Sequence, residues 1–148
     1  MRAKGYFFGA AVAAILIFAA ACAGNNTTVE TPGELVGPFD QLMTALGSEG
    51  FTVDPAGTIS QPFFEPEGQV ISLDGQEVQV FEFASEAEAA SAAEMISPDG
   101  SSIGTSMMTW ISPPHFYHSG KLMVLYLGEN ERVMAALEGI LGPQIAGR

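Results

Sequence analysis

The chain has 148 residues, of which 47% are hydrophobic and only 15% charged, with 17 Asp and Glu against five Lys and Arg. This length suits one domain, and so high an apolar content excludes an intrinsically disordered chain. The net charge of −12, without any basic cluster, argues against nucleic-acid binding because phosphate would be repelled. A single Cys excludes an internal disulfide framework and a Cys-rich zinc site.

Residues 1–21 have the three-part plan of a secretory signal peptide. Arg2 and Lys4 give a positive start, residues 7–20 are apolar, and three alanines stand directly before Cys22. This arrangement resembles the lipobox of bacterial lipoproteins. The resemblance implies a diacylglyceryl group on the Cys22 sulfur and cleavage just before Cys22 by a dedicated peptidase. It also implies anchoring to the cell membrane or outer membrane, with the domain outside the cytoplasm.

Two other interpretations of this segment stay open. An ordinary signal peptidase would also cut after the Ala-x-Ala pattern at 19–21, and an uncleaved anchor over 7–23 would have 17 residues, near the lower limit for crossing a bilayer. Residues 22–33 are predicted to be a lipidated Cys and a flexible polar tether, and residues 34–148 a single globular domain. After removal of residues 1–21, three basic and 17 acidic side chains leave a net charge of −14.

The first half of the domain is predicted to hold one helix and the start of a sheet. Pro38 suits a first helical turn, and apolar residues follow at 39, 42, 43 and 46 with helical spacing. Residues 51–54 are a strand candidate that Pro55 ends, and residues 57–68 are a Pro-interrupted loop. The dipeptide at 74–75, Asp-Gly, predicts a tight hairpin turn between strands at 70–73 and 77–83.

The second half is predicted to continue with two helices and two strands. Ser85 caps an Ala-rich helix, with Glu88 three residues on to complete a capping box. Strands are expected at 107–111 and at 121–127, the latter apolar enough to be covered on both faces. A helix at 131–141 then ends at a Gly-Pro pair.

These elements predict an α+β fold: an antiparallel sheet of four to five strands with about three helices packed on one face. Residues 75–96 and 120–141 share the order turn glycine, strand, helix. When the two stretches are aligned at an offset of 45, Val78 matches Met123 and Val80 matches Leu125. The domain is therefore consistent with a duplicated β-hairpin plus helix unit.

Catalysis has no support in the sequence. Residues 100–104 match the G-x-S-x-G nucleophile elbow around Ser102, but the stretch follows a helix and precedes a strand, the reverse of that motif's context. No Asp follows Ser102, and both histidines come before the remaining glutamates, so the hydrolase order of Ser, acid and His cannot be met. No enzymatic activity and no cofactor are predicted.

The only two histidines of the chain, His115 and His118, are candidates for a soft-metal site. With Met107, Met108 and Met123 they offer ligands that suit copper. Behind two prolines, however, the segment is extended or turning, where residues three apart point away from each other. The sequence therefore favours hydrogen-bonded histidines and methionines that fill the core, and no metal is predicted.

Aromatic and proline residues gather at 61–64 and 110–117. If these stretches meet, their rings offer a recognition surface, with Phe63, Phe64, Trp110, Phe116 and Tyr117 as its candidates. The competing interpretation places them in the core, and the small size of the domain favours it. The predicted function is a lipid-anchored binding or protein-interaction module of the cell envelope, with an envelope protein as partner. The alternative is a small-ligand or metal-binding lipoprotein.

Overall fold

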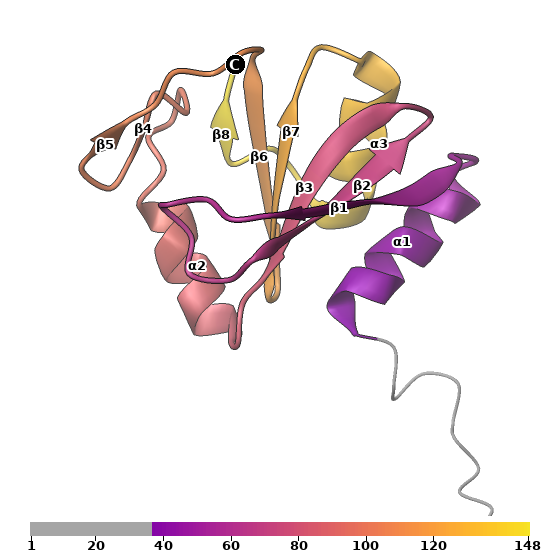
Figure 1. The fold of residues 1–148 in the computed structure, drawn as a ribbon, viewed down its shortest axis with the longest axis horizontal. Helices are drawn as coiled ribbons and strands as arrows, with labels where there is room; N and C mark the ends of the chain where they lie inside the picture. The colour runs from indigo at the N-terminus through magenta and orange to yellow at the C-terminus, as the bar shows by residue number, and fades with distance from the viewer. Residues whose placement is uncertain (1–36) are drawn as a thin grey trace, which may run out of the picture. The chain divides into compact units, whose positions relative to one another are not determined.

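The computed structural model describes residues 37–148, which form an antiparallel sheet with helices on both of its faces (Figure 1). The signal peptide, Cys22 and the tether predicted up to residue 33 lie outside the described residues. The elements are α1 (Pro38–Ser48), β1 (Val53–Ile59), β2 (Gly68–Leu73), β3 (Gln76–Glu82), α2 (Glu86–Glu94), β4 (Ser102–Ile103), β5 (Ser106–Met107), β6 (Pro114–Ser119), β7 (Leu122–Leu127), α3 (Glu131–Leu141) and β8 (Ala146–Gly147). In this part of the chain no helix has the length and hydropathy to cross a bilayer.

The main sheet has six strands in the order β1-β2-β3-β7-β6-β8, which confirms the α+β class but exceeds the four to five strands predicted. Hairpins β2–β3 and β6–β7 form its centre, and β3 pairs with β7 between them. The extra strands come from β6 and β8, neither of which was predicted. Strands β4 and β5 form a separate two-stranded hairpin.

Strand β1 continues through Pro55, where the sequence predicted its end. It lies at the edge of the sheet and pairs only with β2, and edge strands tolerate proline because one of their two sides has no partner strand. A register shift between Pro55 and Gly57 marks a bulge there, and Gly57 has the positive φ of 128°. An edge position therefore tolerates residues that a central strand would reject.

The helices do not all pack on one face, and this corrects the predicted architecture. Leu42 of α1 and Leu137 of α3 share one core cluster, whereas Ala89 and Ala92 of α2 belong to a second. Strand β7 lies between the clusters: its side chains alternate, with Val124 in the first and the neighbouring residues in the second. The prediction that this strand is covered on both faces is confirmed, and the fold has three layers.

The order hairpin then helix does occur twice, as β2–β3–α2 and β6–β7–α3. The two helices nevertheless cover opposite faces of the sheet, and the aligned residues Val80 and Leu125 belong to different core clusters. In the structure Val80 pairs across the strands with Val124 instead. The repeat is therefore one of element order and is not matched residue by residue.

Local signals placed the helix ends and the first hairpin correctly. The Ser85 Oγ accepts a hydrogen bond from the backbone N–H of Glu88 at 3.2 Å, and α3 occupies the predicted residues. Asp74 and Gly75 turn the β2–β3 hairpin with φ angles of 49° and 87°, as the Asp-Gly dipeptide predicted.

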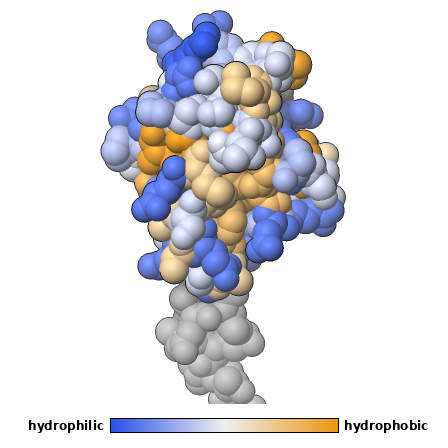
Figure 2. All heavy atoms as spheres, turned by 90° about the vertical axis from the view of Figure 1, so that its left-hand side faces the viewer, coloured by the Kyte–Doolittle hydropathy of each residue, from blue (hydrophilic) through white to orange (hydrophobic). Residues whose placement is uncertain are grey.

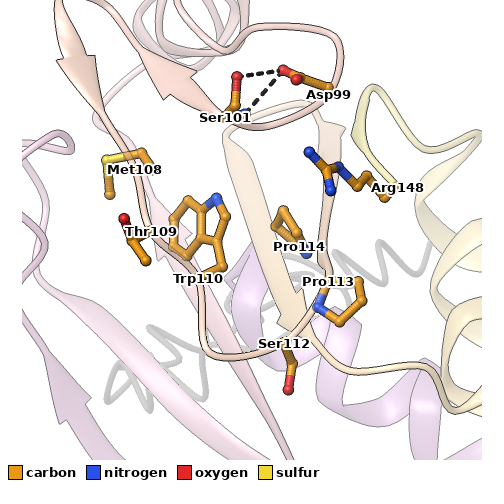
Figure 3. A pocket seen from close by; sticks show the side chains of 9 residues that line it. All are labelled: Asp99, Ser101, Met108, Thr109, Trp110, Ser112, Pro113, Pro114 and Arg148. Atoms are coloured by element: carbon orange, nitrogen blue, oxygen red, sulfur yellow. Dashed lines mark hydrogen bonds between the residues drawn. The ribbon is translucent and has the colours of Figure 1, made fainter.

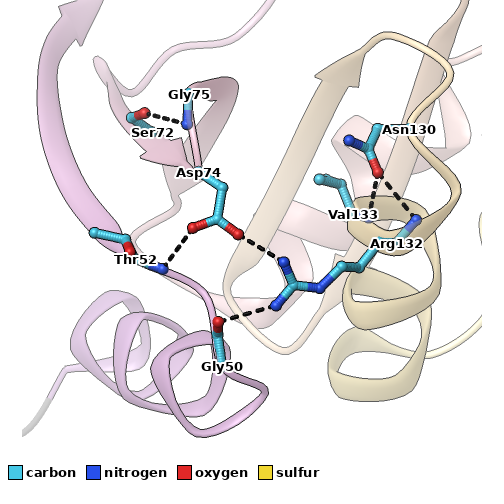
Figure 4. A network of polar contacts seen from close by, with 8 residues as sticks. All are labelled: Gly50, Thr52, Ser72, Asp74, Gly75, Asn130, Arg132 and Val133. Carbon is cyan, nitrogen blue, oxygen red and sulfur yellow. Dashed lines mark hydrogen bonds and ion pairs between the residues drawn. The ribbon is translucent and has the colours of Figure 1, made fainter.

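Arg132 joins three segments that are distant in sequence (Figure 4). Its guanidinium donates to the Asp74 carboxylate at 2.7 Å and to the Gly50 carbonyl at 2.9 Å, and lies 4.1 Å from the ring centroid of Phe51. Asp74 in turn accepts from the backbone N–H of Thr52 at 2.9 Å. The network ties the end of α1 and the β2–β3 turn to the start of α3.

Candidate functional site

The two aromatic stretches, 61–64 and 110–117, meet on the α2 side of the sheet. This was the condition under which they could form a recognition surface. The ring of Phe63 lies edge-to-face with that of Trp110, at 6.1 Å between centroids, and Trp110 lies in the same way on Phe116 at 5.8 Å. Phe63 also contacts Phe64, whose ring packs on Phe81. A chain of rings therefore runs from the surface into the second core cluster.

Only two of the five residues predicted for this surface contribute to it. Phe64, Phe116 and Tyr117 are buried, with exposed fractions of 5%, 0% and 1%. Tyr117 even lies in the other cluster, under α1 and α3, where burial raises the pKa of its phenol. Phe63 and Trp110 are half-buried. The core interpretation thus holds for three residues, and the exposed edge of the cluster belongs to Phe63 and Trp110.

Beside Phe63 the surface is hollowed between α2 and the loop before β2. We call this depression of about 370 Å³ the α2 hollow; it is lined by Phe63, Phe64, Glu65, Phe83, Ala87, Glu88, Ser91, Ala92 and Met95. Figure 2 views the molecule from the side of α2 and the β4–β5 hairpin, and it shows apolar surface gathered in the middle of this face with hydrophilic residues around it. The small side chains of α2 leave the hollow open, because alanine projects no atom beyond Cβ.

Met95 and two carboxylates form the rim of the α2 hollow. Met95, at the end of α2, is 47% exposed although it is a large apolar side chain. Glu65 and Glu88 are both exposed, and with Glu82 and Lys121 they also line a neighbouring depression of about 530 Å³. The rim is therefore apolar at one point and acidic at two others.

A second depression, the Asp99 cleft, lies on the other side of Trp110 and has a volume of about 400 Å³. Its lining is more polar: Asp99, Ser101, Met108, Thr109, Trp110, Ser112, Pro113, Pro114 and Arg148. Figure 3 shows Asp99 and Arg148 on the same side of the cleft, with Trp110 opposite. Within residues 37–148 the guanidinium of Arg148 has no ion pair. The cleft therefore offers a cation, a carboxylate and an aromatic ring to a small molecule.

A tight turn holds Asp99 in place. One oxygen of its carboxylate accepts hydrogen bonds from the Ser101 backbone N–H at 3.0 Å, from the Ser101 hydroxyl at 2.8 Å and from the Ser97 hydroxyl at 2.9 Å. These donors stabilise the ionised form, and they lower the pKa of Asp99 from 3.8 to about 2. At neutral pH the cleft therefore carries a fixed negative charge.

We expect the Asp99→Asn variant to unfold at a lower temperature than the unmodified protein at pH 7. This gap, the difference between the two unfolding temperatures, should narrow as the pH falls from 4 to 2. Because the folded pKa is below the unfolded value, the stabilisation is present above about pH 4 and is lost as the pH falls through about 2. Thermal unfolding at pH 7, 4 and 2 measures the gap. A gap of constant size would show that the ionised carboxylate does not stabilise the turn.

The two histidines of the candidate metal site do not converge. His115 is buried: its ring stacks on Tyr126, its Nε2 lies 2.8 Å from the Gly128 carbonyl oxygen, and its Nδ1 lies 2.8 Å from Oε1 of Gln144. His118, three residues along β6, points to the other face of the sheet, as the extended spacing predicted. Within residues 37–148 no group of three His, Cys, Asp or Glu side chains is placed to hold a metal ion.

The predicted strand at 107–111 is wrong, and the error matters for the site. Of the predicted residues only Met107 belongs to a strand, β5, which pairs with Ser102–Ile103. The Ser102 of the G-x-S-x-G match therefore lies in a short strand. The chain then turns so that the Trp110 indole N–H donates to the Gly100 carbonyl at 2.7 Å, while Ile111 is 93% exposed. This hydrogen bond brings the only Trp to the Asp99 cleft. The apolar pattern at 107–111 predicted a strand and did not indicate this turn.

Sequence reasoning missed Met95 and Glu65, which line the α2 hollow. Met95 has a faint signal, since it follows an alanine helix whose small residues leave a surface uncovered. Glu65 has none, because its place depends on how the loop folds against α2. Comparison of the chain with protein-family models, with curated proteins and with solved structures gives no match.

Proposed function

We propose that the protein is a lipid-anchored binding module of the cell envelope, attached to the cell membrane or outer membrane through Cys22 and facing outside the cytoplasm. The anchor is supported by the positive start, the apolar stretch and the three alanines before Cys22. More than one acyl chain on Cys22 would hold the domain stably at the membrane. In this proposal the protein acts by binding another protein and carries out no catalysis.

The α2 hollow is the observation that supports binding. Residues 37–148 carry 15 acidic and three basic side chains, so the surface of this domain is mostly acidic. Against this background the hollow has a largely apolar lining that includes the half-buried Phe63 and the exposed Met95. Exposed apolar patches rimmed by polar residues are typical of sites that contact other proteins.

Mass spectrometry of the full-length protein tests the anchor. The protein is extracted in mild detergent from membranes of its own host and measured under native and denaturing conditions. A mass that corresponds to a chain starting at Cys22 with acyl groups supports the anchor. A chain cut before Cys22 without lipid, or one that still begins at Met1, overturns it.

The same preparation tests the α2 hollow as the binding surface. We expect Met95→Ser to reduce the amount of protein companion retained about tenfold, since truncation of a well-buried interface side chain costs on the order of 1.4 kcal/mol or more. The matched control is Met107→Ser, because Met107 is 83% exposed and does not line the hollow. Equal retention by the two variants would contradict the assignment of the hollow.

The Asp99 cleft supports a second candidate function, the binding of a small ligand. Arg148 could pair with an anionic group of the ligand, and the ring of Trp110 could cover its apolar part. The native mass spectrum distinguishes this candidate from the first. A stoichiometric small molecule in place of a protein companion would favour it.

A further inference from the structure

The charges around the α2 hollow point to the chemistry of its partner: we infer that the hollow binds a cationic amphipathic segment of another protein, with apolar side chains in the hollow and Lys or Arg at its acidic rim. This inference rests on the proposed binding function and specifies the partner. The lining provides apolar contacts, since Phe63 offers a half-buried ring and Met95 a flexible thioether to side chains of varied shape.

The acidic half comes from the carboxylates beside the hollow. Glu65 and Glu88 stand on its rim, and Glu82 joins them around the neighbouring depression. Lys121 is the one basic residue that lines either depression, and it forms no ion pair within residues 37–148. Three carboxylates around one ammonium group leave a negative potential, which attracts a cationic partner and steers its approach.

Charge also favours this cationic partner over two other occupants of the hollow, a second copy of the chain and an anionic lipid surface. A second copy of the chain would bring its own 15 acidic and three basic side chains to the same surface, so the two copies would repel one another. An anionic lipid surface would be repelled for the same reason. A partner that combines apolar side chains with Lys or Arg satisfies both the lining and the rim.

A pair of synthetic peptides tests the inference. The probe is a short amphipathic peptide of leucine and lysine, and its counterpart has glutamate in place of each lysine. The protein used is the compact unit Thr31–Arg148, which contains both core clusters, and a cooperative thermal transition verifies that it is folded. Trp110, the only Trp, contacts Phe63 on the hollow, so its fluorescence reports binding of a peptide without aromatic residues.

We expect the lysine peptide to bind and the glutamate peptide not to bind. The double variant Glu65→Gln with Glu88→Gln should raise the Kd for the lysine peptide about fivefold, since each exposed ion pair contributes modestly to the binding free energy. Glu77→Gln with Glu129→Gln is the matched control. These substitutions remove the same amount of charge, but the two exposed carboxylates do not line the hollow or the neighbouring depression. This control should change the Kd less than about twofold, and added salt should weaken binding to the unmodified protein.

The outcomes separate the inference from the function on which it rests. If both double variants weaken binding equally, the attraction belongs to the whole acidic surface and the inference is overturned. If the glutamate peptide binds as well as the lysine peptide, the hollow recognises apolar side chains alone; the proposed function then stands without the cationic partner. If neither peptide binds, the inference of a cationic partner is overturned. If Met95→Ser also leaves companion retention unchanged, the assignment of the hollow as the binding surface fails with it.

Discussion

Replacing Phe116 with alanine is expected to lower the free energy of unfolding by about 3–5 kcal/mol, which is the usual cost of removing a buried phenylalanine. The Phe116 side chain is fully buried in the cluster beneath α2, and Trp110 packs on its ring. The variant would leave a cavity between the sheet and the half-buried indole. Chemical denaturation monitored by circular dichroism measures the change.

The control for Phe116 is Ile111→Ala, since Ile111 is 93% exposed and only five residues away. Its replacement should change the free energy of unfolding by no more than about 0.5 kcal/mol. A loss below about 1 kcal/mol for Phe116→Ala would contradict its place in the core and would restore it as a surface residue.

Replacing Gly68 with valine is expected to cost about 3 kcal/mol, because the ring of Phe81 occupies the space that a side chain would need. Gly68 opens β2 opposite Phe81, and a Cβ atom at this position would lie 2.5 Å from a carbon of the ring. Phe81 is fully buried and packs on Phe64, so it cannot move away freely.

A double-mutant cycle isolates this contact. In a Phe81→Leu background the clash is relieved, so Gly68→Val should cost at least about 1 kcal/mol less than it does alone. Gly75→Ala is a poor control here, since Gly75 has a positive φ and would be strained in open space. Additive costs of the two changes would show that the ring does not cause the loss.

Signals that depend on neighbouring residues predicted the local structure well. The Asp-Gly turn, the Ser85 cap and the limits of α3 each rest on backbone geometry or on hydrogen bonds within a few residues. The α+β class followed from the order of these elements. Such features need no knowledge of the rest of the fold.

What the sequence could not predict depends on which segments become neighbours. Pro55 reads as the end of a strand unless its place at the sheet edge is known, and the Ala-rich α2 carries no mark of the face that it covers. The aromatic residues divide in the same way: composition required most of them inside but could not assign Phe116 to the core and Phe63 to the surface. The sequence therefore predicted which types of residue form the site, but it could not predict which of them are exposed.

The bulged edge strand β1 limits how a partner can be recognised. Pro55 offers no N–H, the register shifts before Gly57, and the opposite edge ends in β8, which is only two residues long. Neither edge of the sheet presents a long, regular row of main-chain donors and acceptors with which a strand of a partner could pair. For the proposed binding, selectivity would then reside in side chains. A change of the proposed partner would then require only a few altered surface residues, while the sheet beneath stays the same.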